Sequence, residues 1–206
     1  MSIDGRLGLK NGKSKWITNE DSRSNVHKLR ADFDAIVVGG NTLREDNPLL
    51  TTRGIKESEP LRVVFTKTLN FPKQYQLWDT QVSKTLIVYD SSTADEKYLK
   101  TIPKNVFIEK ISSDNPKLLS ELLAKKGCNK VLWECGPKLA TSAVNAGCIQ
   151  ELITFIAPKI LGGENFMNPF ADFGFTSMEE IINLNFEEIK CFHDDLCLKS
   201  IFKLKT

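Results

Sequence analysis

The segment Gly39–Arg53 carries the largest group of residues suited to chemistry. A short apolar run, Ala35–Gly39, ends in two glycines and opens onto Thr42 and Asp46. In an open α/β sheet, ligands bind beyond the carboxyl ends of the strands, and glycines let a ligand approach the backbone. The segment therefore indicates a ligand site. The Asn-Pro pair at 47–48 is also a good turn, so a purely structural loop stays open as an alternative.

A second candidate segment begins at Glu134. This carboxylate follows the apolar run Lys130–Trp133, where it serves either as a functional group or as a surface cap, and the sequence leaves both open. Gly136 and Pro137 come next, and a helical pattern follows. A glycine ahead of the first helical turn lets a pyrophosphate lie against free backbone N–H groups. The segment predicts phosphate binding without the G-x-G-x-x-G motif of a Rossmann fold.

Two further segments are candidates of a weaker kind. Trp16 lies between Ser14 and Thr18, just ahead of a predicted helix whose free N–H groups suit an anionic or planar ligand. The alternative is a capped helix with Trp16 as a hydrophobic lid. The run Ile156–Gly163 leads from a strand into proline and two glycines, and a tight turn is sufficient to explain it.

Alternating strands and helices must hold these segments in place. Thr18, with Asp21 three residues later, resembles a capping box and begins a helix predicted over 19–32. Further helical patterns cover 94–101, 115–126 and about 137–146. Short apolar runs indicate strands buried on both faces: Ala35–Gly39, Leu61–Phe65, Thr85–Tyr89, Val106–Ile108, Lys130–Trp133 and Leu152–Ile156. The alternation predicts an α/β fold with a mostly parallel central sheet flanked by helices.

The C-terminal part follows a different pattern. Residues 184–191 and 196–203 alternate apolar and polar, and turn residues lie between them at 193–195, which predicts an antiparallel hairpin at a sheet edge. The long irregular pieces are expected at 50–60 and 67–83 only. The chain shows no repeat and no low-complexity linker, so we expect one domain over 1–206.

The composition excludes several classes of protein. With 41% hydrophobic and 26% charged residues, the chain is globular rather than disordered or fibrous. A net charge of +2 is too balanced for a general nucleic-acid or membrane-surface binder. No apolar run approaches the roughly 18 residues of a membrane span, and the polar start predicts no signal peptide. Five scattered cysteines argue against a disulfide framework or a metal site, and predict reduced thiols in the cytoplasm.

Six sequence blocks occur in an order that carries a family resemblance: S-I-D-G-R, S-K-W-I-T, V-H-K-L-R-A-D, D-A-I-V-V-G-G-N-T-L-R-E-D-N-P-L-L-T-T-R, W-E-C-G-P-K-L-A and I-A-P-K-I-L-G-G. The chain resembles the reductase domain of the bifunctional riboflavin biosynthesis protein over nearly its whole length, most strongly over 2–53 and 130–163. The resemblance implies a dihydrofolate-reductase-like fold. It also implies that NADPH is used to reduce the ribosyl group of 5-amino-6-(5-phosphoribosylamino)uracil to a ribityl chain.

The resemblance further implies roles for individual residues. The matched substrate contacts are Ser14, Arg30, Leu50, Arg53 and Glu134. The matched NADP contacts are Trp16, Thr42, Asp46, Gly136, Pro137, Lys138, Leu139, Ala140, Thr141 and Ser142. Guanidinium groups suit a sugar phosphate, and Arg30 and Arg53 supply them. Of the two candidate catalytic residues, Asp46 is expected to handle the proton as hydride reaches the sugar C1, and Glu134 to fix the pyrimidine or a ribose hydroxyl.

The chain departs from the family pattern in three places. The family has a full strand before S-x-D-G, often with a lysine, whereas this chain begins at Met1, inside the corresponding strand. Lys67 stands where the family tends to have Asp, and it either favours the 2′-phosphate of NADP or is simply exposed. The zinc deaminase half, with H-x-E and P-C-x-x-C, is missing from the sequence, so only the reduction is expected.

Two other interpretations stay open. One is a reductase of the same fold acting on another pyrimidine or a pteridine, such as a dihydrofolate or diaminopyrimidine reductase. The other is a non-catalytic, nucleotide-binding remnant. On the leading interpretation we expect NADPH as cofactor, a small phosphoribosylaminopyrimidine as substrate, no nucleic-acid or membrane partner, and a homodimer that covers the edge hairpin.

Overall fold

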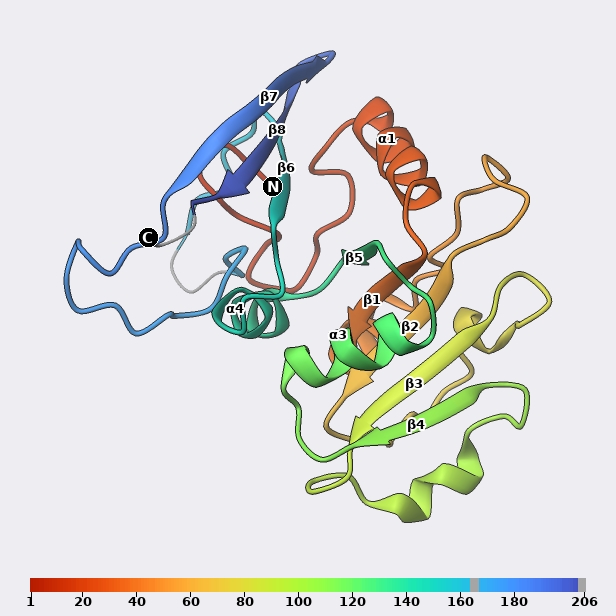
Figure 1. Ribbon diagram of the computed structural model, residues 1–206. Coiled ribbons are helices and arrows are strands. Elements are labelled where there is room, and N and C mark those ends of the chain that lie inside the picture. The colour runs from red at the N-terminus through yellow and green to blue at the C-terminus, as the bar shows by residue number, and fades with distance from the viewer. Residues whose placement is uncertain (164–166, 204–206) are drawn as a thin grey trace.

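A computed structural model describes residues 1–163 and 167–203 (Figure 1). Its larger sheet has five parallel strands in the order β4-β3-β2-β1-β5. The strands are β1 Ala35–Gly39, β2 Leu61–Thr66, β3 Thr85–Asp90, β4 Phe107–Ile111 and β5 Val131–Trp133. Five of the six predicted strands lie in this sheet, and the α/β class with a parallel central sheet is confirmed.

Both faces of this sheet are covered. Ile36 and Val38 of β1 pack into one core cluster with Leu43 of α2, Gly40–Asp46. The alternate residues of β1 pack into a second cluster with Leu119 and Leu123 of α3, Pro116–Lys125, which crosses the near face in Figure 1. The remaining helical elements are α1 Glu20–Ala31, α4 Pro137–Asn145 and the 3₁₀ helices η1 Gln76–Trp78 and η2 Glu96–Thr101. Burial from two sides explains why the strand sequences are apolar throughout.

The C-terminal hairpin is confirmed, but it lies in a separate sheet. Strands β6 Glu151–Ile156, β7 Leu184–Phe192 and β8 Asp195–Phe202 form an antiparallel sheet in the order β6-β8-β7. The sequence interpretation grouped β6 with the parallel strands, and that grouping was wrong. β6 pairs with β8 because an apolar run reports burial of a strand and not the identity of its neighbour.

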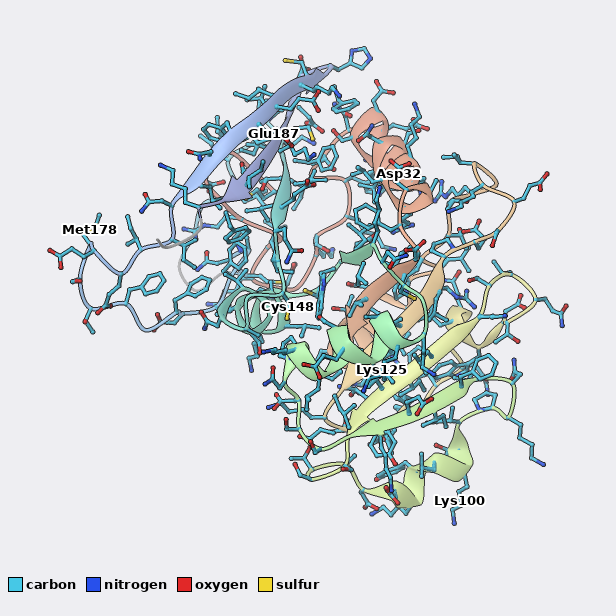
Figure 2. All side chains as sticks on the ribbon, viewed as in Figure 1. Asp32, Lys100, Lys125, Cys148, Met178 and Glu187 are labelled. Atoms are coloured by element: carbon cyan, nitrogen blue, oxygen red, sulfur yellow. The ribbon has the colours of Figure 1, made fainter. Side chains whose placement is uncertain are left out.

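Three local expectations also need correction. The N-cap of α1 is Asn19 rather than Thr18, because the Asn19 side chain accepts a hydrogen bond from the Ser22 N–H at 2.9 Å. The segment 94–101 contains the 3₁₀ helix η2 rather than an α-helix. The described parts of 157–183 form no helix or strand, so this stretch is a third long irregular piece. Met178 lies on its outlying loop, at the edge of the molecule in Figure 2.

The first residues of the chain attach to β6. The Met1 ammonium donates to the Phe155 carbonyl at 2.6 Å, and the Met1 carbonyl accepts from the Ala157 N–H at 2.8 Å. Ser2 forms a parallel bridge with Ala157. Residues 1–2 therefore pair with the end of β6 and the residue after it.

Candidate active site

An ion pair between Arg30 and Glu134 lies at the centre of the candidate site. Arg30 comes from the last turn of α1, and its Nε and Nη2 donate to the two Glu134 oxygens at 2.7 and 2.8 Å. The side chains are 12% and 23% exposed. The Glu134 N–H donates to the Val37 carbonyl at 2.9 Å, so the backbone of this residue is fixed against β1. A bidentate pair of this kind has a defined geometry and orients the carboxylate.

The same arginine also binds the loop after α2. Arg30 Nη1 donates to the Thr51 carbonyl at 3.0 Å, and His27 Nδ1 lies 3.0 Å from the same oxygen. His27 is one turn before Arg30 on α1, and its Nδ1 is 3.2 Å from Arg30 Nη1. Burial lowers the pKa of His27, with the positive charges of Arg30 and Arg53 contributing in the same direction. These effects favour the neutral imidazole, while the hydrogen bond to the Thr51 carbonyl acts in the opposite direction.

The loop that follows α2 has an unusual backbone. Asn47, Leu50 and Arg53 all have positive φ angles, of 44°, 54° and 56°. Residues other than glycine are rarely held in this left-handed region, where each costs about 1–3 kcal/mol, and such residues cluster at functional sites. Leu50 is 3% exposed and belongs to the core, so its side chain does not face solvent. Arg53 is exposed, and no hydrogen bond or ion pair joins it to another described residue.

The predicted cofactor residues meet where α2 and α4 begin. A Cβ placed on Gly136, the N-cap of α4, would lie 3.8 Å from the Thr42 hydroxyl, and one on Gly39 would lie 3.7 Å from Leu139. Gly136 makes no side-chain cap, and the first backbone hydrogen bond of α4 runs from Ala140 N–H to the Gly136 carbonyl at 3.0 Å. Free N–H groups therefore face this junction and suit a phosphate group.

The second turn of α4 is engaged in packing. Thr141 is 6% exposed, and its hydroxyl accepts from the Ala171 N–H at 2.8 Å. Pro137 supplies no N–H, while Lys138 is exposed and Ser142 and Ala140 are half-buried. The structure thus places the beginning of the predicted run at the junction and directs Thr141 into the protein.

Asp46 lies at the end of α2. Desolvation raises the pKa of its carboxyl group, the adjacent Glu45 raises it further, and Lys15 lowers it. By contrast, burial raises the pKa of the Cys135 thiol, which follows Glu134 in the chain, to about 12, so this cysteine stays protonated and is not a nucleophile.

Trp16 and Ser14 lie on an exposed loop beside the second sheet. Trp16 is 68% exposed with φ 69°, and the Arg23 guanidinium lies 4.1 Å from its ring centroid. Lys159 Nζ donates to the Trp16 carbonyl at 2.9 Å and so holds the loop against the segment after β6. Ser14 is exposed and is not brought to the Arg30 cluster by any hydrogen bond in the described residues.

The S-x-D-G block has a structural role. Asp4 accepts hydrogen bonds from the N–H groups of Leu161 at 3.2 Å and Gly162 at 2.8 Å. Hydrogen bonding from Ser2 is the main cause that lowers the pKa of Asp4 to about 2, and the Gly162 N–H adds to it. The carboxylate therefore ties the first residues of the chain to the turn after β6.

His27 is the site residue that the sequence interpretation missed. The signal was its spacing: His27 and Arg30 are three residues apart on a helix, which places their side chains on one face. Lys67, the other basic residue considered, pairs with Asp114 at 2.6 Å and is 63% exposed.

The described residues hold no helix able to cross a membrane and no group of three or more side chains able to bind a metal ion.

The sequence of the chain is similar to a known protein family and to curated relatives. The family model for the RibD C-terminal domain matches residues 1–198. The riboflavin biosynthesis protein RibD of Synechocystis sp. is 39% identical over 188 residues, which cover 89% of this chain and 50% of that protein. The chain thus spans half the length of that curated relative.

Two solved structures share the fold. Acinetobacter baumannii RibD superposes with a TM-score of 0.81 at 24% identity, covering 98% of this chain and 56% of that one. The deaminase/5-amino-6-(5-phosphoribosylamino)uracil reductase of Thermotoga maritima superposes with a TM-score of 0.78 at 22% identity, covering 98% and 54%. At these identities the likeness shows the fold.

Proposed function

The chain belongs to the RibD C-terminal domain family, and we propose that it reduces the ribosyl group of 5-amino-6-(5-phosphoribosylamino)uracil with NADPH. The observation that carries this proposal is that the candidate substrate residues and the candidate cofactor residues are adjacent in the chain. Glu134 holds Arg30, and only two residues later Gly136 faces Thr42. A cofactor at the junction of α2 and α4 would therefore lie next to a substrate at the Arg30 cluster.

The residues at the junction fit NADPH. Gly136 leaves room beside Thr42, and the uncapped start of α4 offers N–H groups for the pyrophosphate. The exposed ring of Trp16 offers a planar surface, although its loop is held from the other sheet through Lys159. When bound, NADPH supplies a hydride to the opened sugar C1.

The protein side chains orient the substrate and manage charge. We assign Arg53 and Arg30, with the groups that Arg30 contacts, to the phosphoribosyl group. We assign Glu134, oriented by Arg30, to the pyrimidine or a ribose hydroxyl. Asp46 handles the proton, since its raised pKa keeps a larger fraction protonated than an exposed aspartate would have. Leu50, with its side chain in the core, offers the substrate its backbone only.

Turnover with the proposed substrate tests the proposal directly. The purified chain should oxidise NADPH, followed by its loss of absorbance, when the deaminated phosphoribosylaminouracil is added. Oxidation with a pteridine or a different pyrimidine instead would assign a different substrate. Tight NADPH binding with no oxidation would indicate the non-catalytic remnant.

We predict that NADPH binds much more tightly than NADH. The 2′-phosphate adds negative charge that a cation such as Lys67, exposed beyond β2, can meet despite its pairing with Asp114. Calorimetric titration with both cofactors measures the difference, and equal affinities would refute the prediction. Lys67→Ala should lower the affinity for NADPH and leave the affinity for NADH unchanged. Lys104→Ala, an exposed control, should change neither affinity.

We propose that the chain forms a homodimer through the second sheet. Strand register places Phe186, Ile189 and Leu196 on one face, where they are 66%, 59% and 40% exposed. β7 is the outer strand of that sheet, and the labelled Glu187 marks its position in Figure 2. Antiparallel pairing of two β7 strands about Ile189 would set Glu188 of each copy opposite Lys190 of the other. This charge complementarity favours a second copy as the occupant.

Light scattering during size-exclusion chromatography tests the dimer. The chain should elute as a dimer, and Ile189→Glu should convert it to a monomer because a carboxylate would be buried without a partner. Ile201→Glu, on the opposite face and 38% exposed, is the matched control and should stay dimeric. A wild-type chain that elutes as a monomer would overturn the proposal.

We also propose that residues 1–206 act as one reductase unit in the cytoplasm. All five cysteines are free thiols, as a reducing compartment would keep them.

A further inference from the structure

The Arg30 guanidinium has little capacity left for a phosphate group. Its Nε and Nη2 donate to Glu134, and its Nη1 donates to the Thr51 carbonyl. A guanidinium has five N–H groups, and the described contacts use three of them, while Nη1 also lies 3.2 Å from His27. A doubly charged phosphate therefore needs further donors beside Arg53.

His27 is placed to be one of them. Its Nδ1 is engaged at 3.0 Å with the Thr51 carbonyl, while no hydrogen bond joins its Nε2 to a described residue. The contact with Thr51 fixes the ring relative to the 47–53 loop, which carries the exposed Arg53. With Nδ1 donating to the carbonyl, Nε2 is the free edge of the ring.

The charges around His27 make it responsive to an anion. Arg30 on the same helix and Arg53 on the facing loop disfavour the imidazolium, and Glu134 after β5 favours it. Burial is the largest cause that lowers the pKa of His27, and the hydrogen bond to the Thr51 carbonyl acts in the opposite direction. A phosphate at Arg53 would offset the positive charge and stabilise a proton on Nε2, taken from solvent or from the phosphate monoanion.

We propose that His27 is a phosphate-recognition residue that, together with Arg53, receives the phosphate of a phosphoribosyl substrate and is protonated when that phosphate binds. The inference rests on the proposed function for the identity of the substrate. Arg30 then acts as a positioning residue that holds Glu134 and Thr51. The pairing of a histidine with an arginine makes phosphate affinity depend on pH, with tighter binding at lower pH.

Imidazole NMR on the whole chain tests this proposal, with ribose 5-phosphate as the probe. The chain has two histidines, so His27→Gln assigns both signals. Saturating ribose 5-phosphate should raise the pKa of His27 by about one unit. His193 is the internal control: it is 80% exposed, lies 3.1 Å from Asp21, and should not move.

Binding measurements separate phosphate recognition from other effects. His27→Gln should lower the affinity for ribose 5-phosphate about tenfold at pH 6.5, because a charge-assisted hydrogen bond is lost. The affinity for NADPH should stay unchanged. Ribose without phosphate should leave the His27 pKa unaltered. A pKa that does not move with ribose 5-phosphate, or that moves equally with inorganic phosphate at both histidines, would overturn the proposal. If His27→Gln does not fold, the wild-type titration decides alone.

Failure of the proposed function gives a different result. A chain that shows the His27 shift with ribose 5-phosphate yet oxidises no NADPH would retain the phosphate site and lose the reductase assignment. A chain that turns over the phosphorylated substrate without any His27 shift would keep the reductase assignment and remove this inference.

Discussion

Asp46→Asn should lower the turnover rate by roughly 10²–10⁴-fold, the usual contribution of general acid–base catalysis. The amide preserves the shape of the side chain at the end of α2 and removes only the ionisable group. NADPH affinity should change much less, because a neutral amide still forms hydrogen bonds. NADPH oxidation with the phosphoribosylaminouracil measures the rate, and calorimetry on the same variant measures the affinity.

The pH dependence gives this prediction a direction. A proton donor works in its protonated form, so the rate should fall as pH rises through the pKa of Asp46, which the site raises above its ordinary value. Glu45→Gln is the matched control. It removes the neighbouring carboxylate that helps to raise this pKa, so turnover should persist with the falling limb moved to lower pH. Normal turnover by Asp46→Asn would exclude Asp46 as the acid, and parallel losses of rate and cofactor affinity would make it a positioning residue.

Glu134→Gln should lower kcat/KM by roughly 10–100-fold, because the amide cannot accept both hydrogen bonds from Arg30 and so loses the orientation for the substrate contact that we propose. The free energy of unfolding should fall by about 1–3 kcal/mol. This value lies between that of an exposed ion pair and that of a fully buried one, since the side chains are 12% and 23% exposed. Steady-state kinetics and denaturant unfolding measure the two effects.

A surface ion pair supplies the control for Glu134→Gln. Glu109 binds Lys126 at 2.7 Å, and these side chains are 42% and 35% exposed. Glu109→Gln should therefore change the unfolding free energy by less than about 1 kcal/mol and leave kinetics unchanged. If the two variants behave alike in both measurements, the Arg30–Glu134 pair has no special part in the site.

The central strands were predictable because their environment is uniform. Strands buried on both faces have continuous apolar sequences, and the predicted Leu61–Phe65 and Thr85–Tyr89 differ from β2 and β3 by one residue each. The Gly-Pro start of α4 was predictable for a local reason as well, since proline suits the first turn of a helix.

The sequence could not resolve features that depend on distant partners. Thr18 and Asn19 are both good cap residues; the Asn19 N–H binds Asp195, which is 176 residues away. The contact between Arg30 and Glu134 spans 104 residues. Local patterns carry no information on either pairing, so Arg30 was read as a phosphate ligand alone. The structure shows that Arg30 also binds the Glu134 carboxylate. It also shows that His27 contacts the same Thr51 carbonyl as Arg30, which the sequence did not indicate.

The left-handed backbone at Arg53 has an evolutionary consequence. Glycine adopts φ 56° without a Cβ clash, so Arg53→Gly would relieve local strain, yet it would also delete the exposed cation next to the Thr51–His27 contact. At this position the substitution that favours the fold would oppose the ligand recognition that we propose. Selection for thermostability alone would therefore favour glycine at this position, whereas selection for the proposed phosphate recognition would favour arginine.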